Sequence, residues 1–242
     1  MRRRTLIGSP LLIAPPLLLA GPAVGARGVV ELMTADHRPY ASAGGPEPGF
    51  VLTLAAELFR MVGLQVVFRF MPWPQAEARA AATPGAAIAP LARTPAREGR
   101  FLWAVALFDD PSGFATLHAH PPDSLDEALA LPRIAVLGGG PDEAFLRAQG
   151  FSNLAPMPGR AEALAALHRR EVSAWFCAMP KLRADLGRLA QFGKPVVTQP
   201  AWLAMNPESG DVPVALLREA FAALKADGSL QQLLGPVLGE LR

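Results

Sequence analysis

The sequence predicts an α/β fold with largely parallel strands. Apolar, strand-like segments alternate with amphipathic, helix-like segments from residue 29 onward. No internal repeat or long low-complexity linker interrupts this alternation after residue 27. Such an order is typical of sheets whose strands are connected by helices, and their binding sites lie at the carboxyl ends of the strands.

The expected elements follow one another closely along the chain. The expected strands are 29–35, 64–72, 86–92, 101–108, 133–140 and 172–179, with an extended segment at 194–205. The expected helices are 49–63, 74–82, 124–131, 141–150, 160–170, 181–193 and 212–228.

Periodicity and end signals justify the helices. In the first, apolar residues recur every three or four positions and Gly63 follows as a stop. Ser124 and Glu127 form a capping-box pattern at the start of the third. Pro141 suits the first position of the fourth helix, and Gly150 suits its end. The last helix places one apolar face on Val214, Leu217, Phe221 and Leu224.

The N-terminus predicts a cleaved secretory signal over residues 1–26. It has three arginines, an apolar stretch and a small-residue end, Val24–Gly25–Ala26. A membrane anchor is the alternative, but the apolar stretch is short and Pro15–Pro16 breaks it. The arginines fit either a general secretory or a twin-arginine signal. We therefore expect a periplasmic protein.

Charge and cysteine content exclude several function classes. The chain has 23 basic and 21 acidic residues, and loss of the signal with its three arginines leaves 20 against 21. This near-neutral balance, without an aromatic-and-basic stripe, argues against nucleic-acid binding. The single cysteine, Cys177, forms no intrachain disulfide and lies in an apolar run as a small buried side chain. About 216 residues remain, enough for one large domain or two lobes.

Five segments in order along the chain carry a resemblance to a known family. They are ADHRPYA at 35–41, GFVLTLAAELFRMVGLQVVFRFMPW at 49–73, LARTPAREGRF at 91–101, SLDEALALPRIAVLGGGPDEAFL at 124–146 and LREAFAALKADGSLQQLL at 217–234. The ordered set resembles the periplasmic solute-binding proteins of the polar amino-acid type, extracellular solute-binding family 3. The resemblance covers nearly the whole chain after Val29.

The resemblance implies a two-lobed, type II periplasmic-binding-protein-like fold with ligand between the lobes. One lobe would comprise 27–109 and 206–242, and the other 113–199. The crossings would be 110–112 and 200–205. The implied function is capture of a small carboxylate-bearing solute, an amino acid or related organic acid, for an ABC permease in the inner membrane. We expect a monomer without a cofactor.

The resemblance also implies ligand residues in the first lobe. Arg97, in a Thr94-x-x-Arg97 turn, matches the arginine that grips the ligand carboxylate, and guanidinium suits that role. Its alternative is a surface arginine paired with Glu98. Trp73 matches an aromatic that packs on the ligand, with burial in the core as its alternative. His37 falls where a second, facing aromatic is usual, and Tyr40 follows closely.

In the second lobe the resemblance points to the loop at Gly139 and Gly140. Free N–H groups and a helix start there favour an anion. Trp175 is a further aromatic candidate. The chain departs from the family pattern at Ala89, Pro90, Ala92, Pro141 and Ala178.

The change at Ala178 removes the usual acid for the ligand ammonium, for which Asp36, Asp142 or Glu143 could substitute. These departures favour a carboxylate with an apolar or aromatic body over a plain amino acid.

Two other functions remain open at this point. Periplasmic dehydratases of prephenate or arogenate look similar in sequence, and Asp142 or Glu143 would then donate a proton. A sensor or partner protein with a degenerate cleft is the third hypothesis. His118 and His120 form a possible metal pair without a third ligand, so we expect no metal site.

Overall fold

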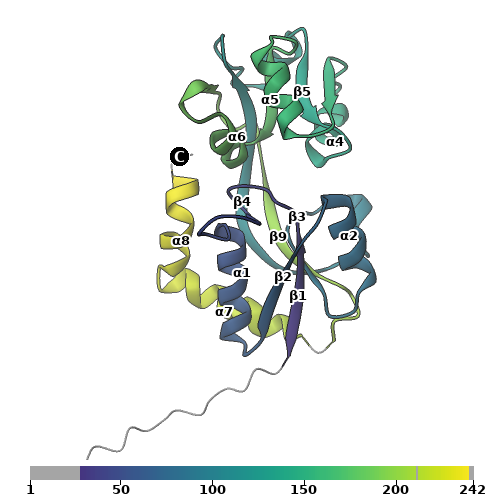
Figure 1. The fold of residues 1–242 in the computed structure, drawn as a ribbon, viewed down its shortest axis with the longest axis vertical. Helices are drawn as coiled ribbons and strands as arrows, with labels where there is room; N and C mark the ends of the chain where they lie inside the picture. Colours follow the sequence, from purple (N-terminus) through teal and green to yellow (C-terminus); the bar gives the residue numbers. More distant parts are fainter. Residues whose placement is uncertain (1–27, 211, 240–242) are drawn as a thin grey trace, which may run out of the picture.

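The computed structural model describes residues 28–210 and 212–239, which form two lobes joined by two long strands. These strands are β4 (Leu102–Thr116) and β9 (Val197–Met205), and both run from one lobe into the other (Figure 1). The expected signal at 1–26 lies outside the described residues. The α/β class with two lobes and two crossings is therefore observed.

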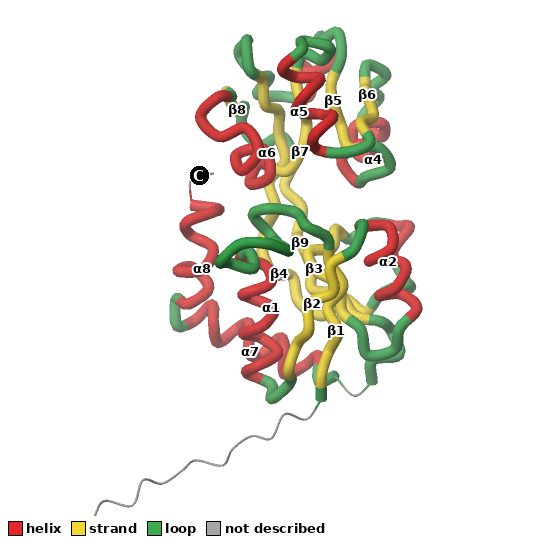
Figure 2. The backbone as a smooth tube through the Cα atoms, in the orientation of Figure 1, coloured by secondary structure: helices red, strands yellow, loops and turns green. Residues whose placement is uncertain are grey.

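Lobe 1 is a sheet in the order β2-β1-β3-β9-β4 with helices on both faces. Its three parallel strands are β1 (Val29–Thr34), β2 (Gln65–Phe70) and β3 (Ala87–Ala92). One face carries α1 (Phe50–Met61), α7 (Val214–Ala226) and α8 (Ser229–Leu238), and the other carries α2 (Trp73–Ala82) (Figure 2). Strand alternation explains this, because Leu32 packs with α1 residues and Met33 packs with α2 residues.

Lobe 2 continues the same hydrogen-bonded path from β4 through β7 and β5 to β6. Its strands are β5 (Ile134–Leu137), β6 (Leu154–Met157), β7 (Ala174–Ala178) and the short β8 (Gln191–Phe192). Its helices are α3 (Leu125–Leu129), α4 (Pro141–Ala148), α5 (Arg160–His168) and α6 (Met179–Leu186), with the 3₁₀ turn η2 (Gly187–Leu189). β5 pairs in parallel with β6 and β7, whereas β4 is antiparallel to β7.

The two crossing strands pair with each other between the lobes. β4 stays continuous through Asp110–Ser112, and Asp110 lies opposite Gln199 of β9. Residues Ala201–Met205 already pair with β3 or β4 within the sheet of lobe 1. The second crossing therefore lies nearer 197–200 than the expected 200–205.

One expected helix differs in its extent, and two elements were not expected. The expected helix 181–193 ends at Leu186, because Gly187 adopts a left-handed φ of 52° that stops it. Phe192 then pairs with Ala115 of β4 instead of continuing the helix. The short strand β6 and the separate helix α8 were not among the expected elements.

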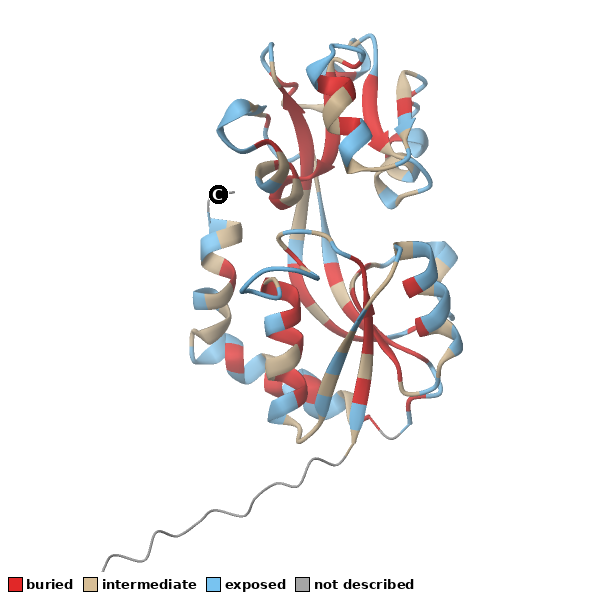
Figure 3. Cartoon of the chain, in the orientation of Figure 1, coloured by how far each residue is buried: buried red, intermediate tan, exposed pale blue. Residues whose placement is uncertain are grey.

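The buried residues follow the central strands of both lobes (Figure 3). The largest apolar cluster includes Tyr40 and Phe108 from lobe 1 and Ala178 and Met179 from lobe 2. The lobes are therefore in direct apolar contact beside the crossings. None of the helices in the described part of the chain is long and apolar enough to cross a membrane.

Candidate functional site

The carboxyl ends of the parallel strands of the two lobes are directed toward each other. In lobe 1, β1, β2 and β3 lead into the loop 35–49, the start of α2 and the turn η1 (Pro95–Arg97). In lobe 2, β5 and β7 lead into the starts of α4 and α6. Because α/β proteins place ligands beyond such strand ends, the region where the lobes meet is the candidate site. We call it the junction, formed by His37, Tyr40, Asp110, Asp142 and Lys181.

A tight loop after β1 positions the first two junction residues. The backbone N–H groups of His37 and Ala41 donate to each other's carbonyl oxygens, both over 3.0 Å. The His37 ring lies 5.7 Å from the Trp73 ring between centroids, tilted by 31°. The two predicted aromatic positions therefore come together, as neighbours at the start of α2. Contact of either ring with a ligand stays a prediction.

Tyr40 connects the first lobe to the crossing and to the second lobe. Its hydroxyl donates to Asp110 Oδ1 over 2.6 Å. Lys181 Nζ, from the first turns of α6, lies 5.1 Å from the centre of the Tyr40 ring, a cation–π contact. The Tyr40 ring itself has no exposed surface. It therefore offers a solute no free face in this structure and acts as a support for Asp110 and Lys181.

Burial shifts the pKa values of two junction groups in opposite directions. Burial, helped by the charges of Lys181 and Arg160, lowers the pKa of His37 from its ordinary 6.5 to about 4. Burial also raises the pKa of Asp110 from 3.8 to about 6, although Lys181 and the Tyr40 hydroxyl oppose it. His37 is therefore uncharged at neutral pH, whereas the pKa of Asp110, about 6, lies close to neutral pH.

Burial also dominates at the lobe 2 side of the junction. It raises the pKa of Asp142, against the attraction of Lys181 and a hydrogen bond from the Cys177 thiol. Burial likewise raises the pKa of Cys177. That thiol is 1% exposed, so the expectation of a buried, unreactive side chain agrees with its position.

The arginine turn after β3 is fully paired within the protein. Arg97 donates to Glu77 Oε2 from Nη2 over 2.6 Å and from Nε over 3.2 Å. Its Nη1 donates to the Ala92 carbonyl over 2.9 Å. Arg100 donates to the other Glu77 oxygen over 2.9 Å. Arg97 is thus neither an open guanidinium nor a partner of Glu98.

Glu98 instead pairs with Arg93, over 2.6 Å, on the surface. Burial alone would raise the pKa of Glu77, but Arg97 and Arg100 outweigh it and lower that pKa. Thr94 lies half-buried before η1, where its carbonyl accepts from the N–H groups of Arg97, over 2.9 Å, and Glu98, over 3.2 Å. The ligand roles of Arg97 and Thr94 stay predictions, and any solute at Arg97 would compete with Glu77.

The glycine loop after β5 also satisfies its own N–H groups. Gly139, with φ of 71°, donates to Glu143 Oε2 over 2.8 Å. Gly138 donates to the Met157 carbonyl over 2.9 Å, and Gly140 donates to the Leu137 carbonyl over 3.3 Å. The three glycine N–H groups are therefore occupied within the protein, and the ligand roles of Gly139 and Gly140 stay predictions. The Gly139 N–H, followed by Arg147, lowers the pKa of Glu143, which makes this carboxylate a poor proton donor.

Trp175 is a correction to the predicted ligand set. Its side chain has no exposed surface and belongs to the apolar cluster on the α5 and α6 side of β7. The strand is buried on both faces, so an aromatic there fills the core whichever way it points. Trp73, by contrast, is only partly buried and packs against the apolar cluster that contains Met33, Ala76 and Ala80.

Sequence reasoning missed three residues that shape the site, namely Glu77, Asp110 and Lys181. Glu77 is 20 residues from Arg97, and Tyr40 is 70 residues from Asp110. No motif or periodicity connects such pairs. A polar residue inside an expected crossing was the only signal available for Asp110.

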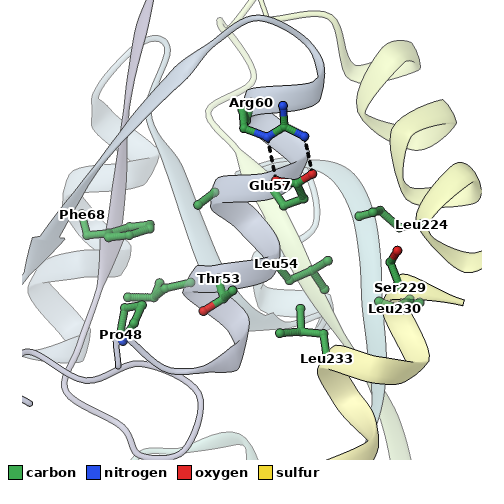
Figure 4. Close-up of a pocket in the computed structure, with 12 residues that line it drawn as sticks. Pro48, Thr53, Leu54, Glu57, Arg60, Phe68, Leu224, Ser229, Leu230 and Leu233 are labelled. Atoms are coloured by element: carbon green, nitrogen blue, oxygen red, sulfur yellow. Dashed lines mark hydrogen bonds and ion pairs between the residues drawn. The ribbon is translucent and has the colours of Figure 1, made fainter. Parts of the chain in front are cut away.

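One apolar pocket of about 580 Å³ lies away from the junction (Figure 4). It is lined by α1, α7, α8 and nearby lobe 1 residues, with the Arg60–Glu57 ion pair at one side. No lobe 2 residue lines it. Within residues 28–210 and 212–239, no group of three or more potential metal ligands occurs.

The opposite pKa shifts predict a pH effect on stability. Between about pH 4 and 6 the folded chain keeps a proton on Asp110 that the unfolded chain has lost, so this group favours unfolding as pH rises. The unfolded chain protonates His37 up to its ordinary 6.5, so this group favours folding as pH rises. The variant Asp110→Asn should therefore gain stability from pH 4.5 to 6 more steeply than the native protein.

Urea denaturation at pH 4.5, 5.25 and 6 measures the effect, with His37→Gln as the opposite control. A single titrating group contributes a slope of at most about 1.4 kcal/mol per pH unit. Parallel stability profiles for the native protein and both variants would show that neither group has the stated shift.

Comparison with known proteins supports the fold and nothing narrower. No family model matches the sequence, and no curated protein matches it. A histidine kinase sensor domain with similarity to periplasmic binding proteins matches with a TM-score of 0.74 and 17% identity, over 88% of this chain and 95% of that one. The amino acid ABC transporter substrate-binding protein AbpA from Streptococcus pneumoniae, bound to L-arginine, matches at 0.72 and 15%, over 87% and 94%.

The GluR0 ligand-binding core from Nostoc punctiforme, in complex with L-glutamate, matches with a TM-score of 0.71 and 17% identity, over 86% of this chain and 98% of that one. Matches of this extent show that the chain has the fold of type II periplasmic binding proteins. The same fold serves transport proteins and sensor domains among these neighbours.

Proposed function

We propose that this protein captures a small carboxylate-bearing solute, an amino acid or related organic acid, between its two lobes. Delivery to an ABC import permease in the inner membrane completes the proposed role. The neighbours described as an ABC transporter substrate-binding protein and a ligand-binding core support solute binding on this fold. The periplasm is the proposed location, because a solute is captured for import before it is transported across the inner membrane.

The observation that carries the proposal is the convergence of charged and aromatic side chains at the junction. His37 and Tyr40 come from the loop after β1, Asp110 comes from the crossing, and Asp142 and Lys181 come from lobe 2. Burying ionisable groups costs free energy, so their concentration between lobes indicates a binding role more than a stabilising one.

The two crossings supply the motion that capture requires. β4 and β9 connect the lobes as an extended pair, and such hinges allow open and closed forms that differ by a few kcal/mol. A solute that contacts both lobes favours the closed form. The proposed contacts are His37, Trp73, Thr94 and Arg97 in lobe 1 and Gly139, Gly140 and Asp142 in lobe 2, with Tyr40 as their support.

A thermal-shift panel of the twenty amino acids and their deaminated acids tests the function. At 100 times its dissociation constant, a bound solute stabilises the fold by about 2.7 kcal/mol. For a chain of this size we expect a rise in melting temperature of about 5 to 10 °C. Trp73→Ala should lose much of this rise, whereas the exposed Leu189→Ala should keep it. A panel without any stabilising compound would reject solute capture of this class.

A sensor or partner protein is the second candidate, and one observation favours it. The two positions that suit a solute carboxylate, at Arg97 and Gly139, hold the protein's own carboxylates from Glu77 and Glu143. A neighbour with the same fold is a histidine kinase sensor domain. This candidate gains support if no compound of the panel stabilises the protein. It gains further support if the purified protein instead binds a protein of the inner membrane.

A further inference from the structure

Lys181, a cation of the junction, has no acidic partner among the described residues. Arg97 is paired with Glu77, and Arg160 is paired with Asp185 of α6. The Gly139 N–H is occupied by Glu143, which also pairs with Arg147. Among the described residues, no acidic oxygen lies within 4.0 Å of Lys181 Nζ.

Lys181 is nonetheless central to the electrostatics of the junction. After burial, its charge is the largest influence on the pKa values of His37, Asp110 and Asp142. The geometry places the lysine beside the same groups, because its Nζ lies 5.1 Å from the centre of the Tyr40 ring and the Tyr40 hydroxyl donates to Asp110 over 2.6 Å. The residue is half-buried, and its ammonium lies over the face of the Tyr40 ring.

We propose that Lys181, rather than Arg97, holds the carboxylate of the captured solute, and that Asp110 and Asp142 hold its ammonium group. The inference rests on the proposed capture of a small carboxylate-bearing solute. It changes the expected substrate class, because it favours a zwitterionic amino acid over the deaminated acid that the missing acid at Ala178 suggested.

The charge balance of the junction supports this assignment. One ammonium faces two carboxyl groups, so the cluster without solute carries an excess of negative charge whenever both carboxyl groups are ionised. A solute ammonium between the aspartates removes that excess, and a solute carboxylate gives Lys181 the acidic partner that it lacks. Both new ion pairs form in a half-buried region, where charge-assisted hydrogen bonds are stronger than at the surface.

The arrangement also explains how binding could select the closed form. Lys181 and Asp142 belong to lobe 2, whereas Asp110 is fixed to lobe 1 through the Tyr40 hydroxyl. A zwitterion that contacts all three side chains therefore joins the lobes at their crossing. The alternative is that Lys181 is a structural clasp, held by Tyr40 alone.

Matched probes separate the two roles. Titration calorimetry would use L-phenylalanine, 2-phenylethylamine and 3-phenylpropanoate, which differ in their charged groups, and the analogous series L-arginine, agmatine and 5-guanidinopentanoate. The variants are Lys181→Met, Lys181→Arg and Arg97→Met. Lys225→Met, on the exposed face of α7, is the control. Melting curves show that each variant folds.

Lys181→Met should weaken binding of the amino acid by about 30-fold or more, since loss of one partner of a shielded pair is costly. The amine, which has no carboxylate, should bind this variant within about threefold of the native protein, a difference well below the tenfold that corresponds to 1.4 kcal/mol. Lys181→Arg should retain most of the amino-acid affinity, and Lys225→Met all of it.

The inference fails if Lys181→Met weakens amine and amino acid equally, which is the result for a structural clasp. It also fails if only Arg97→Met abolishes amino-acid binding, although solute capture would then stand. Absence of binding by the native protein to every probe in both series would contradict this inference and the proposed function together. If Lys181→Met does not fold, Lys181→Gln takes its place. The same comparison of amino-acid and amine affinities then distinguishes a ligand role from a structural role.

Discussion

Replacing Gly49 by alanine should lower the free energy of unfolding by about 2–4 kcal/mol. Gly49 precedes α1 with φ of 95° and ψ of 150°, a conformation that side chains rarely adopt. A Cβ atom there would lie 2.5 Å from the Tyr40 carbonyl oxygen and 2.8 Å from the Ala41 nitrogen. Both are backbone atoms, so the clash cannot be relieved by turning a side chain. Urea denaturation measures the loss.

The same change should disturb the junction. The first N–H groups of α1, from Phe50 and Val51, donate to the carbonyls of Pro39 and Tyr40 over 3.2 and 3.1 Å. Gly49 therefore fixes the loop that presents His37 and the Tyr40 hydroxyl. Gly44→Ala is the matched control, because a Cβ there meets no atom within 4 Å and its φ is not left-handed. Equal stability of the two variants would show that the close approach at Gly49 is not a constraint.

Local signals in the sequence were sufficient for most of the helices and strands, whereas the two-lobed arrangement came from the family resemblance. The periodic helix 49–63 is observed as α1, which ends before Gly63. The capping box at α3 is observed in part, since the Glu127 N–H donates to the Ser124 hydroxyl over 3.2 Å. The Glu127 carboxylate accepts from the Asp123 N–H instead of the Ser124 N–H. Such signals act within a few residues, so they report turns and helix ends well.

The charged pairs of the site could not be predicted in this way. Glu98 is next to Arg97 in sequence, yet it pairs with Arg93 because these two residues flank the tight turn η1. Arg97 instead pairs with Glu77 of α2. Ala76 and Ala80 of the same helix are buried in the core and fix its position. A pairing between two elements depends on how they pack, and one sequence alone carries no record of that packing. The approach of Lys181 to Tyr40 across the lobes has the same cause.

Glu77→Ala should lower the free energy of unfolding by about 2–3 kcal/mol. The Glu77 and Arg97 side chains are only 16% and 12% exposed, so they form a largely shielded pair. Removing the acid leaves Arg97 and Arg100 close together without a counter-charge. This loss lowers the free energy of unfolding more than the removal of one arginine does. Arg97→Ala should therefore cost less than Glu77→Ala, because Glu77 keeps its 2.9 Å contact with Arg100. Urea denaturation of both variants measures the order.

Glu98→Ala is the matched control, since Glu98 and Arg93 are each 46% exposed and solvent screens their attraction. It should change stability far less than Glu77→Ala does. The double variant Glu77→Ala with Arg97→Ala should be more stable than the sum of the single losses predicts, because no unpaired charge at Arg97 remains. If Glu77→Ala is instead neutral in stability and Arg97 becomes able to bind carboxylate probes, Glu77 is a removable stand-in for a solute. The arginine would then have the ligand role that the family resemblance implies.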